Sequence, residues 1–192
     1  MCKLLLVRHG QSTWNSENKF TGWVDVQLSK QGENEAQKSG ILLKKLNINL
    51  DFFYTSYLKR AINTLEIILK EISLEKQEYV KAWELNERHY GSLTGLNKDE
   101  VKKKLGDELF KKYRRSWDVA PPPQDQNSQN KKFYSLLNKD IDQSLIPDTE
   151  SLKDTFNRVV SYFEKQIRPH LLNNKNIIIA AHGNSLRALC KK

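Results

Sequence analysis

Two of the four histidines in the sequence stand directly before a glycine at the end of an apolar run. The first run ends in Arg8-His9-Gly10 and the second in His182-Gly183. An imidazole can act as a nucleophile or carry a proton near neutral pH, and a following glycine lets backbone approach a ligand. A guanidinium beside the ring recruits an oxyanion and disfavours ring protonation. These residues predict a two-histidine site where phosphorus is the electrophile, because phosphoryl transfer depends on charge neutralisation.

Both histidine runs consist of Leu, Ile, Val and Ala, the pattern of parallel strands buried on both faces. Segments with apolar residues at helical spacing lie between such runs, so strands and helices alternate. This alternation predicts an α/β fold with a mostly parallel central sheet covered by helices on both faces, and ligands bind where such strands end. We expect strands at 3–8, 51–55, 78–83 and 177–181, and helices at 30–46, 57–72, 152–167 and in short lysine-rich pieces up to about 117.

Residues at the helix ends carry capping signals. Ser29 is the predicted N-cap of the helix at 30–46. Asp148 or Thr149 is the predicted cap of the helix at 152–167, and Pro169 should lie beyond its end. We expect the other two histidines, His89 and His170, to be structural or exposed, and the four tryptophans to be packing residues.

The length of 192 residues suits one domain, 1–192, that buries its own core. Residues 121–147 lack periodicity and are rich in Pro, Gln, Asn, Ser and Lys, which predicts an irregular insertion loop. Two cysteines without metal-ligand spacing are typical of a reducing compartment. The opening apolar stretch is far shorter than a signal peptide or membrane span. We therefore expect a cytoplasmic protein without membrane association.

The net charge of +9 favours an anionic partner but does not choose among nucleic acid, phospholipid and a small phosphorylated metabolite. A basic nucleic-acid-binding module therefore stays open as an alternative. The lysine clusters at 102–104 and 111–112 are more typical of solvated helix faces than of a binding patch, and no nucleic-acid motif is present. No acidic cluster has the spacing of metal ligands, so we expect no metal.

Longer ordered motifs surround the two histidines. They read LVRHGQSTWN at 6–15, KFTGW at 19–23, YTSYLKRAI at 54–62, LNERHYG at 85–91, GLNK at 95–98 and AAHGNSLRA at 180–188. With these motifs almost the whole chain resembles the cofactor-dependent phosphoglycerate mutases of the histidine phosphatase superfamily. The resemblance implies a three-layer α/β/α domain that interconverts 3-phosphoglycerate and 2-phosphoglycerate in glycolysis and gluconeogenesis. It further implies 2,3-bisphosphoglycerate as the cofactor, small-molecule phosphoglycerates as partners and a possible homodimer.

The resemblance also implies roles for individual residues. His9 would be the nucleophile that becomes a phosphohistidine, and Glu87 the general acid and base. Arg8, Arg60 and His182 would neutralise the transferred phosphoryl group. The remaining pocket and substrate-binding positions would be Ser12, Asn15, Thr21, Gly22, Tyr90, Lys98, Arg114, Arg115, Gly183 and Asn184. From composition alone, adjacent arginines such as Arg114 and Arg115 are more often exposed at a helix end.

Some features depart from the family. Gln11 stands where the family has glutamate, whereas Ser12 and Gly22 favour the glycolytic mutase over the bisphosphoglycerate mutases, which carry glycine and serine there. The loop at 121–147 matches poorly. The family continues past the position of Lys192 with another strand and a mobile tail over the site.

Without the mobile tail over the site, we expect water to reach the phosphohistidine and to release its phosphate by hydrolysis. Two readings therefore remain as alternatives, a phosphatase on the same scaffold and an inactive truncated homologue. The cations Lys98, Arg114 and Arg115 favour the mutase, because a broad phosphatase has less need to hold a second anionic group.

Overall fold

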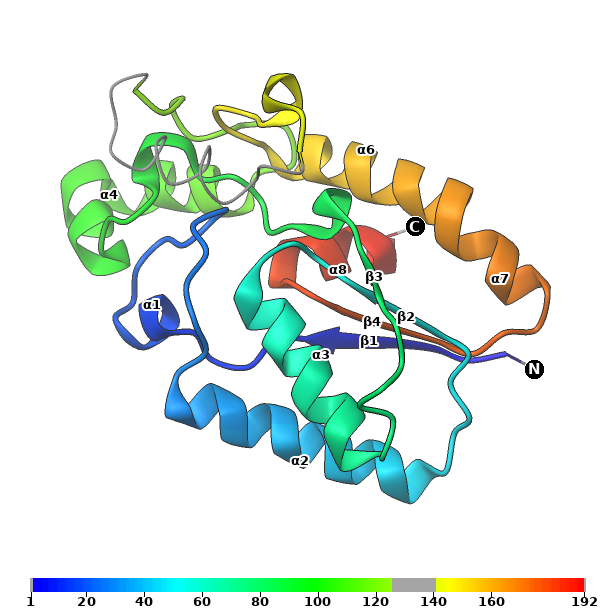
Figure 1. The fold of residues 1–192 in the computed structure, drawn as a ribbon. Helices are drawn as coiled ribbons and strands as arrows, with labels where there is room; N and C mark the ends of the chain where they lie inside the picture. The colour runs from blue at the N-terminus through cyan, green and yellow to red at the C-terminus, as the bar shows by residue number, and fades with distance from the viewer. Residues whose placement is uncertain (1, 126–140, 192) are drawn as a thin grey trace.

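The computed structural model describes residues 2–125 and 141–191, and its centre is a four-stranded parallel sheet (Figure 1). The strands are β1 (Leu4–Arg8), β2 (Phe52–Thr55), β3 (Val80–Lys81) and β4 (Ile177–Ala181), in the order β1-β4-β2-β3. Every residue of β4 is buried, as its unbroken apolar run predicts. β1 and β4 pair in parallel with Arg8 opposite Ala181. The prediction that both histidine runs end at one sheet edge is therefore confirmed.

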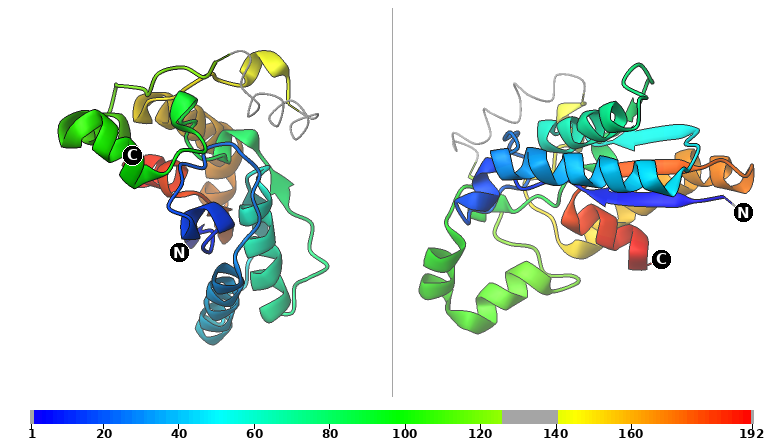
Figure 2. Two further views of the ribbon diagram at one scale, coloured as in Figure 1. Left: turned by 90° about the vertical axis from the view of Figure 1, so that its left-hand side faces the viewer. Right: turned by 90° about the horizontal axis from the view of Figure 1, so that it is seen from below.

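Helices cover both faces of the sheet (Figure 2). α2 (Lys30–Leu46) and α3 (Lys59–Glu71) lie on one face, where Leu65 and Ile68 pack against Ile178 of β4. The other face carries α6 (Leu152–Tyr162), a π-helical turn (Phe163–Ile167), α7 (Arg168–Leu172) and α8 (Gly183–Lys191). Val159 and Leu186 belong to the core on that side. The predicted three-layer α/β/α architecture is confirmed.

The elements that shape the site lie at the carboxyl edge of the sheet (Figure 1). They are α1 (Thr13–Ser16), α4 (Lys98–Arg115) and the 3-10 turns Trp83–Leu85 and Gly91–Leu93; a further 3-10 turn is Gln143–Leu145. α4 breaks at Gly106, which has φ +77°, so the lysine-rich segment forms two consecutive helical pieces. Val101 and Phe110 of α4 pack on Phe20, which fixes this helix beside the loop that follows α1.

Two capping predictions differ in outcome. Ser29 caps α2 by accepting a hydrogen bond from Gly32 N, as predicted. α6 is capped by Ser151 and not by Asp148 or Thr149, because Ser151 and Asp154 form a reciprocal capping box.

The helix predicted to stop before Pro169 continues to Leu172. Pro169 stands in the first turn of α7, where its missing N–H is tolerated. The third predicted strand is shorter than 78–83, because only Val80 and Lys81 pair with β2. The predicted loop at 121–147 lies mostly outside the described residues.

The turn after His9 is held against α2 by two glycines. A Cβ added to Gly10 would lie 2.2 Å from the carbonyl oxygen of Gly32, and one added to Gly32 would lie 2.0 Å from that of Gln11. Gln11 O also accepts a hydrogen bond from Ser29 N at 2.8 Å. The backbone that follows the first histidine therefore sits directly on the start of α2.

Candidate active site

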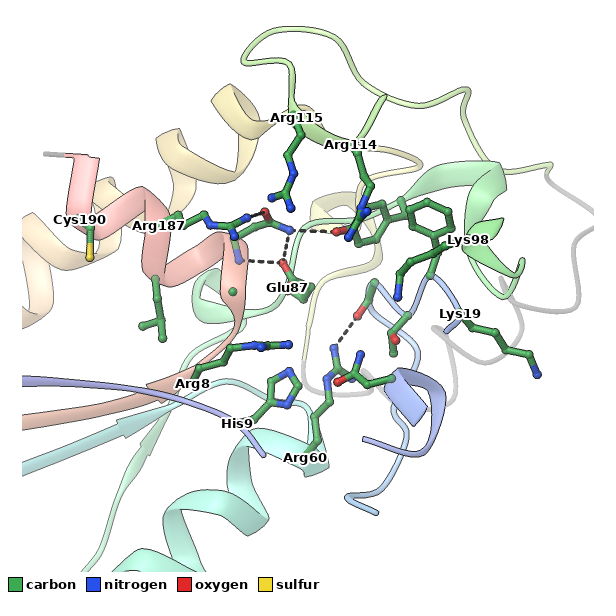
Figure 3. Close-up of a pocket in the computed structure, with 18 residues that line it drawn as sticks. Arg8, His9, Lys19, Arg60, Glu87, Lys98, Arg114, Arg115, Arg187 and Cys190 are labelled. Atoms are coloured by element: carbon green, nitrogen blue, oxygen red, sulfur yellow. Dashed lines mark hydrogen bonds between the residues drawn. The ribbon is translucent and has the colours of Figure 1, made fainter. Parts of the chain in front are cut away.

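His9 lies at the end of β1 with one ring nitrogen committed to the backbone. Its Nδ1 is 2.6 Å from the carbonyl oxygen of Gly10, and because a carbonyl can only accept, Nδ1 carries the proton. Nε2 therefore keeps its lone pair, and the ring lines a cavity of about 460 Å³ (Figure 3). Burial, followed by the charge of Arg60, lowers the pKa of His9 to about 3. The side chain is thus a neutral imidazole with its nucleophilic nitrogen available.

His182 follows β4 and packs edge-on against His9, with ring centroids 4.9 Å apart. Its Nε2 lies 2.7 Å from Ser56 Oγ, which itself accepts a hydrogen bond from Leu58 N. The Ser56 hydroxyl is then satisfied by donating to Nε2, which places the proton of His182 on Nδ1. This buried Nδ1 has no hydrogen-bond partner among the described residues. A buried donor without a partner is costly, so it suits an anionic ligand oxygen.

Two arginines flank the histidine pair. Arg60, near the start of α3, is 1% exposed and donates to the carbonyl oxygens of Val24 and Gly22 at 2.8 Å each. Burial lowers its pKa to about 10, which leaves it protonated at neutral pH. Arg8 extends from the end of β1 into the same cavity (Figure 3). Both side chains offer fixed positive charge beside His9.

Glu87 lies in the loop after the 3-10 turn Trp83–Leu85, at the edge of the cavity. Its Oε1 accepts hydrogen bonds from Arg88 N at 2.8 Å and from Asn184 N and Nδ2 at 3.3 and 2.8 Å. Oε2 accepts no hydrogen bond within the described part of the chain. Asn184 Nδ2 also lies 3.1 Å from Tyr90 Oη, which joins the three side chains (Figure 3). One carboxylate oxygen is therefore anchored and the other is open for proton exchange.

A group of cations closes the far side of the cavity. Lys98 starts α4, Arg114 and Arg115 end it, and Arg187 projects from α8 toward the same space (Figure 3). Partial burial and then the charge of Arg187 lower the pKa of Arg115, and burial and then Arg114 lower that of Lys98. None of these four cations pairs with a carboxylate within residues 2–125 and 141–191. Crowded cations without acidic partners fit a ligand with a second anionic group.

Most residues that the sequence singled out meet at this cavity. All of them line it except Ser12 and His182, which are fully buried, and Asn15 lines it from α1. Thr21 also lines it, with a buried hydroxyl that has no hydrogen-bond partner among the described residues. Ser12 caps α1 through a capping box with Asn15.

Five further residues line the cavity that were not predicted from the sequence, namely Lys19, Phe20, Leu186, Arg187 and Cys190. Four of these lie within the quoted motifs, all but Cys190, and Lys19 and Arg187 had a usable signal, namely basic side chains close in sequence to assigned site residues.

His89 and His170 lie away from this chemistry. His89 is buried and its Nδ1 accepts a hydrogen bond from Gly91 N, while His170 lies in α7 against Phe52. In the described segments no group of three or more His, Cys, Asp or Glu side chains is arranged to hold a metal ion, and no helix is long and apolar enough to cross a membrane.

The low pKa of His9 makes folding stability depend on pH. The unfolded chain takes up a proton on this histidine below about pH 6.5, whereas the folded chain does so only near pH 3, so stability should fall as the pH falls through that window. We expect His9 to account for a loss of roughly 1.5 kcal/mol between pH 6.5 and 5. Urea unfolding of the native chain and of His9→Gln at both pH values measures this contribution. Equal losses in the two proteins would contradict the expectation.

A family model described as the histidine phosphatase superfamily (branch 1) matches residues 4–131. The 2,3-bisphosphoglycerate-dependent phosphoglycerate mutase of Pelagibacter ubique is 54% identical over 191 residues, which cover 100% of this chain and 80% of that protein. The enzyme of the same name from Staphylococcus saprophyticus is 51% identical, with coverage of 100% and 84%.

Solved structures agree with the fold. The crystal structure of phosphoglycerate mutase from Bacillus anthracis aligns with a TM-score of 0.71 at 20% identity, covering 99% of this chain and 78% of that one. With about half of its residues identical to those of the named mutases over its whole length, this chain belongs to the histidine phosphatase superfamily and, within it, to the 2,3-bisphosphoglycerate-dependent phosphoglycerate mutases.

Proposed function

We propose that the chain interconverts 3-phosphoglycerate and 2-phosphoglycerate through a phosphohistidine on His9. The observation that carries this proposal is a single cavity with two cationic ends. A neutral His9 whose Nε2 keeps its lone pair lies at one end, four cations without a carboxylate partner among the described residues lie at the other, and Glu87 lies between them. A ligand with a phosphate and a second anionic group matches both ends.

At the histidine end, Nε2 of His9 attacks phosphorus. The N–P bond forms as the bond from phosphorus to the leaving oxygen breaks, and the equatorial oxygens gain negative charge. Arg8 and Arg60 neutralise that charge, and the Thr21 hydroxyl, which has no hydrogen-bond partner among the described residues, supplies a hydrogen bond, while His182 packs edge-on against the His9 ring. These groups are fixed before the reaction, so little reorganisation is needed.

Glu87 exchanges the proton of the leaving or attacking hydroxyl. Its Oε1 is held by Asn184, so Oε2 is the oxygen that gives a proton to the leaving alkoxide when His9 is phosphorylated. The same oxygen takes a proton from the attacking hydroxyl when the phosphoryl group leaves His9. Such a carboxylate makes both half-reactions possible with one residue.

At the other end, Tyr90, Lys98, Arg114 and Arg115 bind the carboxylate and the phosphate that is not transferred. The positive charge at both ends of the cavity also fits 2,3-bisphosphoglycerate, the compound on which the relatives depend according to their names. When bound, this compound supplies the phosphoryl group that primes His9. The same side chains would hold it.

Phosphorus NMR tests the proposal directly. The purified chain is mixed with 3-phosphoglycerate and a trace of 2,3-bisphosphoglycerate, and we expect 2-phosphoglycerate to appear. Inorganic phosphate without 2-phosphoglycerate would instead identify a phosphatase. An unchanged spectrum from folded protein would contradict both activities.

Removing the buried guanidinium near His9 should have a large effect on rate. We expect Arg60→Gln to lower kcat/KM by roughly 10²- to 10³-fold, because one fixed charge at the transferred phosphoryl group is lost. Lys59→Gln is the matched control, since the neighbouring Lys59 side chain is half exposed and does not line the cavity. Initial rates with 3-phosphoglycerate measure both variants. Similar rates for the two would contradict the assigned role of Arg60.

A further inference from the structure

We infer that Arg158, together with Glu150, is a positioning residue that sets Glu87 for proton transfer. The inference rests on the proposed function, because it presumes that Glu87 is the general acid and base. Arg158 lies in α6 and Glu150 just before that helix, and neither lines the cavity. Their side chains are 9% and 4% exposed and form an ion pair.

Arg158 uses all five of its donors. Nε and Nη2 donate to the two carboxylate oxygens of Glu150 at 2.6 and 2.9 Å. Nη1 donates to the carbonyl oxygens of Glu84 at 2.6 Å and Asn86 at 3.0 Å, and Nη2 also donates to that of Glu87 at 3.0 Å. One guanidinium therefore holds three carbonyls of the segment that carries the proposed acid.

Glu150 fixes the other end of the same segment. Its Oε2 accepts a hydrogen bond from His89 N at 2.7 Å, and its own N–H donates to His89 O at 3.0 Å. The ion pair thus grips the backbone on both sides of Glu87. With the backbone held in this way, the carboxylate of Glu87 accepts its hydrogen bond from Asn184, which lies in the first turn of α8.

Regular structure does not replace these contacts. The 3-10 turn ends at Leu85, and the backbone from Asn86 to Tyr90 belongs to no helix or strand. Within the described residues, the carbonyls of Asn86 and Glu87 accept hydrogen bonds only from Arg158. A misplacement of about 1 Å at a reacting group can cost on the order of 10²-fold in rate. A lysine cannot reproduce the clamp, because it lacks the planar fork that reaches both the carboxylate and the carbonyls.

The proton dependence of the leaving group separates positioning from general damage. A glycerate oxygen needs a proton as it leaves phosphorus, whereas 2,4-dinitrophenolate leaves without one. We expect Arg158→Lys to slow the phosphorylation of His9 by 2,3-bisphosphoglycerate by roughly 10- to 100-fold. Single-turnover phosphorylation by 2,4-dinitrophenyl phosphate should change by less than about 3-fold, and the KM for 3-phosphoglycerate should change as little.

Two reference variants make the result decisive. Arg168→Lys alters an exposed arginine of α7 that pairs with Glu164, and it should leave both rates unchanged. Glu87→Gln should show the same selective loss as Arg158→Lys. If Glu87→Gln does not selectively slow phosphorylation by 2,3-bisphosphoglycerate, the proposed role of Glu87 fails. If Glu87→Gln shows this selective loss but Arg158→Lys slows the reactions with both phosphoryl donors equally, the positioning inference is overturned.

A milder substitution tests the inference even if Arg158→Lys does not fold. Glu150→Gln keeps the size of the side chain and weakens its grip on Arg158 and His89, so a smaller loss with the same selectivity for the glycerate donor is expected. Circular dichroism and the Tm show which variants fold. A folded Glu150→Gln protein with both rates unchanged, or with both lowered equally, would contradict the inference.

Discussion

Replacing His9 with alanine is expected to lower kcat/KM for 3-phosphoglycerate by about 10⁴-fold or more, because no nucleophile remains to take the phosphoryl group. The cavity and its cations would persist, so the variant should still bind phosphoglycerates. Acid-labile phosphate on the protein, measured after mixing with labelled 2,3-bisphosphoglycerate, should vanish with the activity. Isothermal titration calorimetry with 3-phosphoglycerate checks the binding.

The matched control is His170→Ala, which removes a histidine that lies in α7 against Phe52 rather than in the cavity. It should retain near-native turnover and labelling. A labelled His9→Ala protein would move the phosphohistidine to another residue, and His182 would then be the first to replace.

Glu87→Gln is expected to lower kcat for the mutase reaction by roughly 10²- to 10⁴-fold, because the amide keeps the hydrogen bond to Asn184 but cannot exchange a proton. KM should change little, since the cations that bind the substrate stay in place. Steady-state kinetics with 3-phosphoglycerate measures both parameters. Glu78→Gln, at an exposed position outside the cavity, is the control, and comparable losses in the two variants would count against Glu87 as the acid.

The positions of the two histidines could be predicted because strong local patterns bear on them. An unbroken run such as Ile177–Ala181 has few alternatives to a buried parallel strand, and the carboxyl end of such a strand is a fixed place in the fold. Ser29 was found as the cap of α2 for the same reason, since its partner Gly32 is three residues away. Local signals were therefore enough for the sheet, its order of layers and the histidine end of the cavity.

Roles that depend on contacts between residues far apart in sequence could not be predicted. Because 29% of the residues in the chain are charged, an isolated arginine such as Arg158 is expected to be solvated. In the structure it donates to the carbonyl oxygens of Asn86 and Glu87, more than 70 residues away in sequence. The cap of α6 was placed too early for a different reason: Asp148 and Thr149 are good capping residue types, and the local capping-box pattern of Ser151 and Asp154, three residues apart, was overlooked. The homodimer and the loop at 121–147 stay predictions.

The pairing of β1 with β4 also affects how the chain folds during its synthesis. Leu4 pairs with Ile177, so the strand that presents His9 has to wait on the ribosome until almost every later residue described has been synthesised. Closing so long a loop is slow in entropic terms, whereas α2 and α3 can pack on each other early. A nascent chain would thus hold helices long before it holds a reactive histidine, and phosphate chemistry would begin only when the fold is nearly complete.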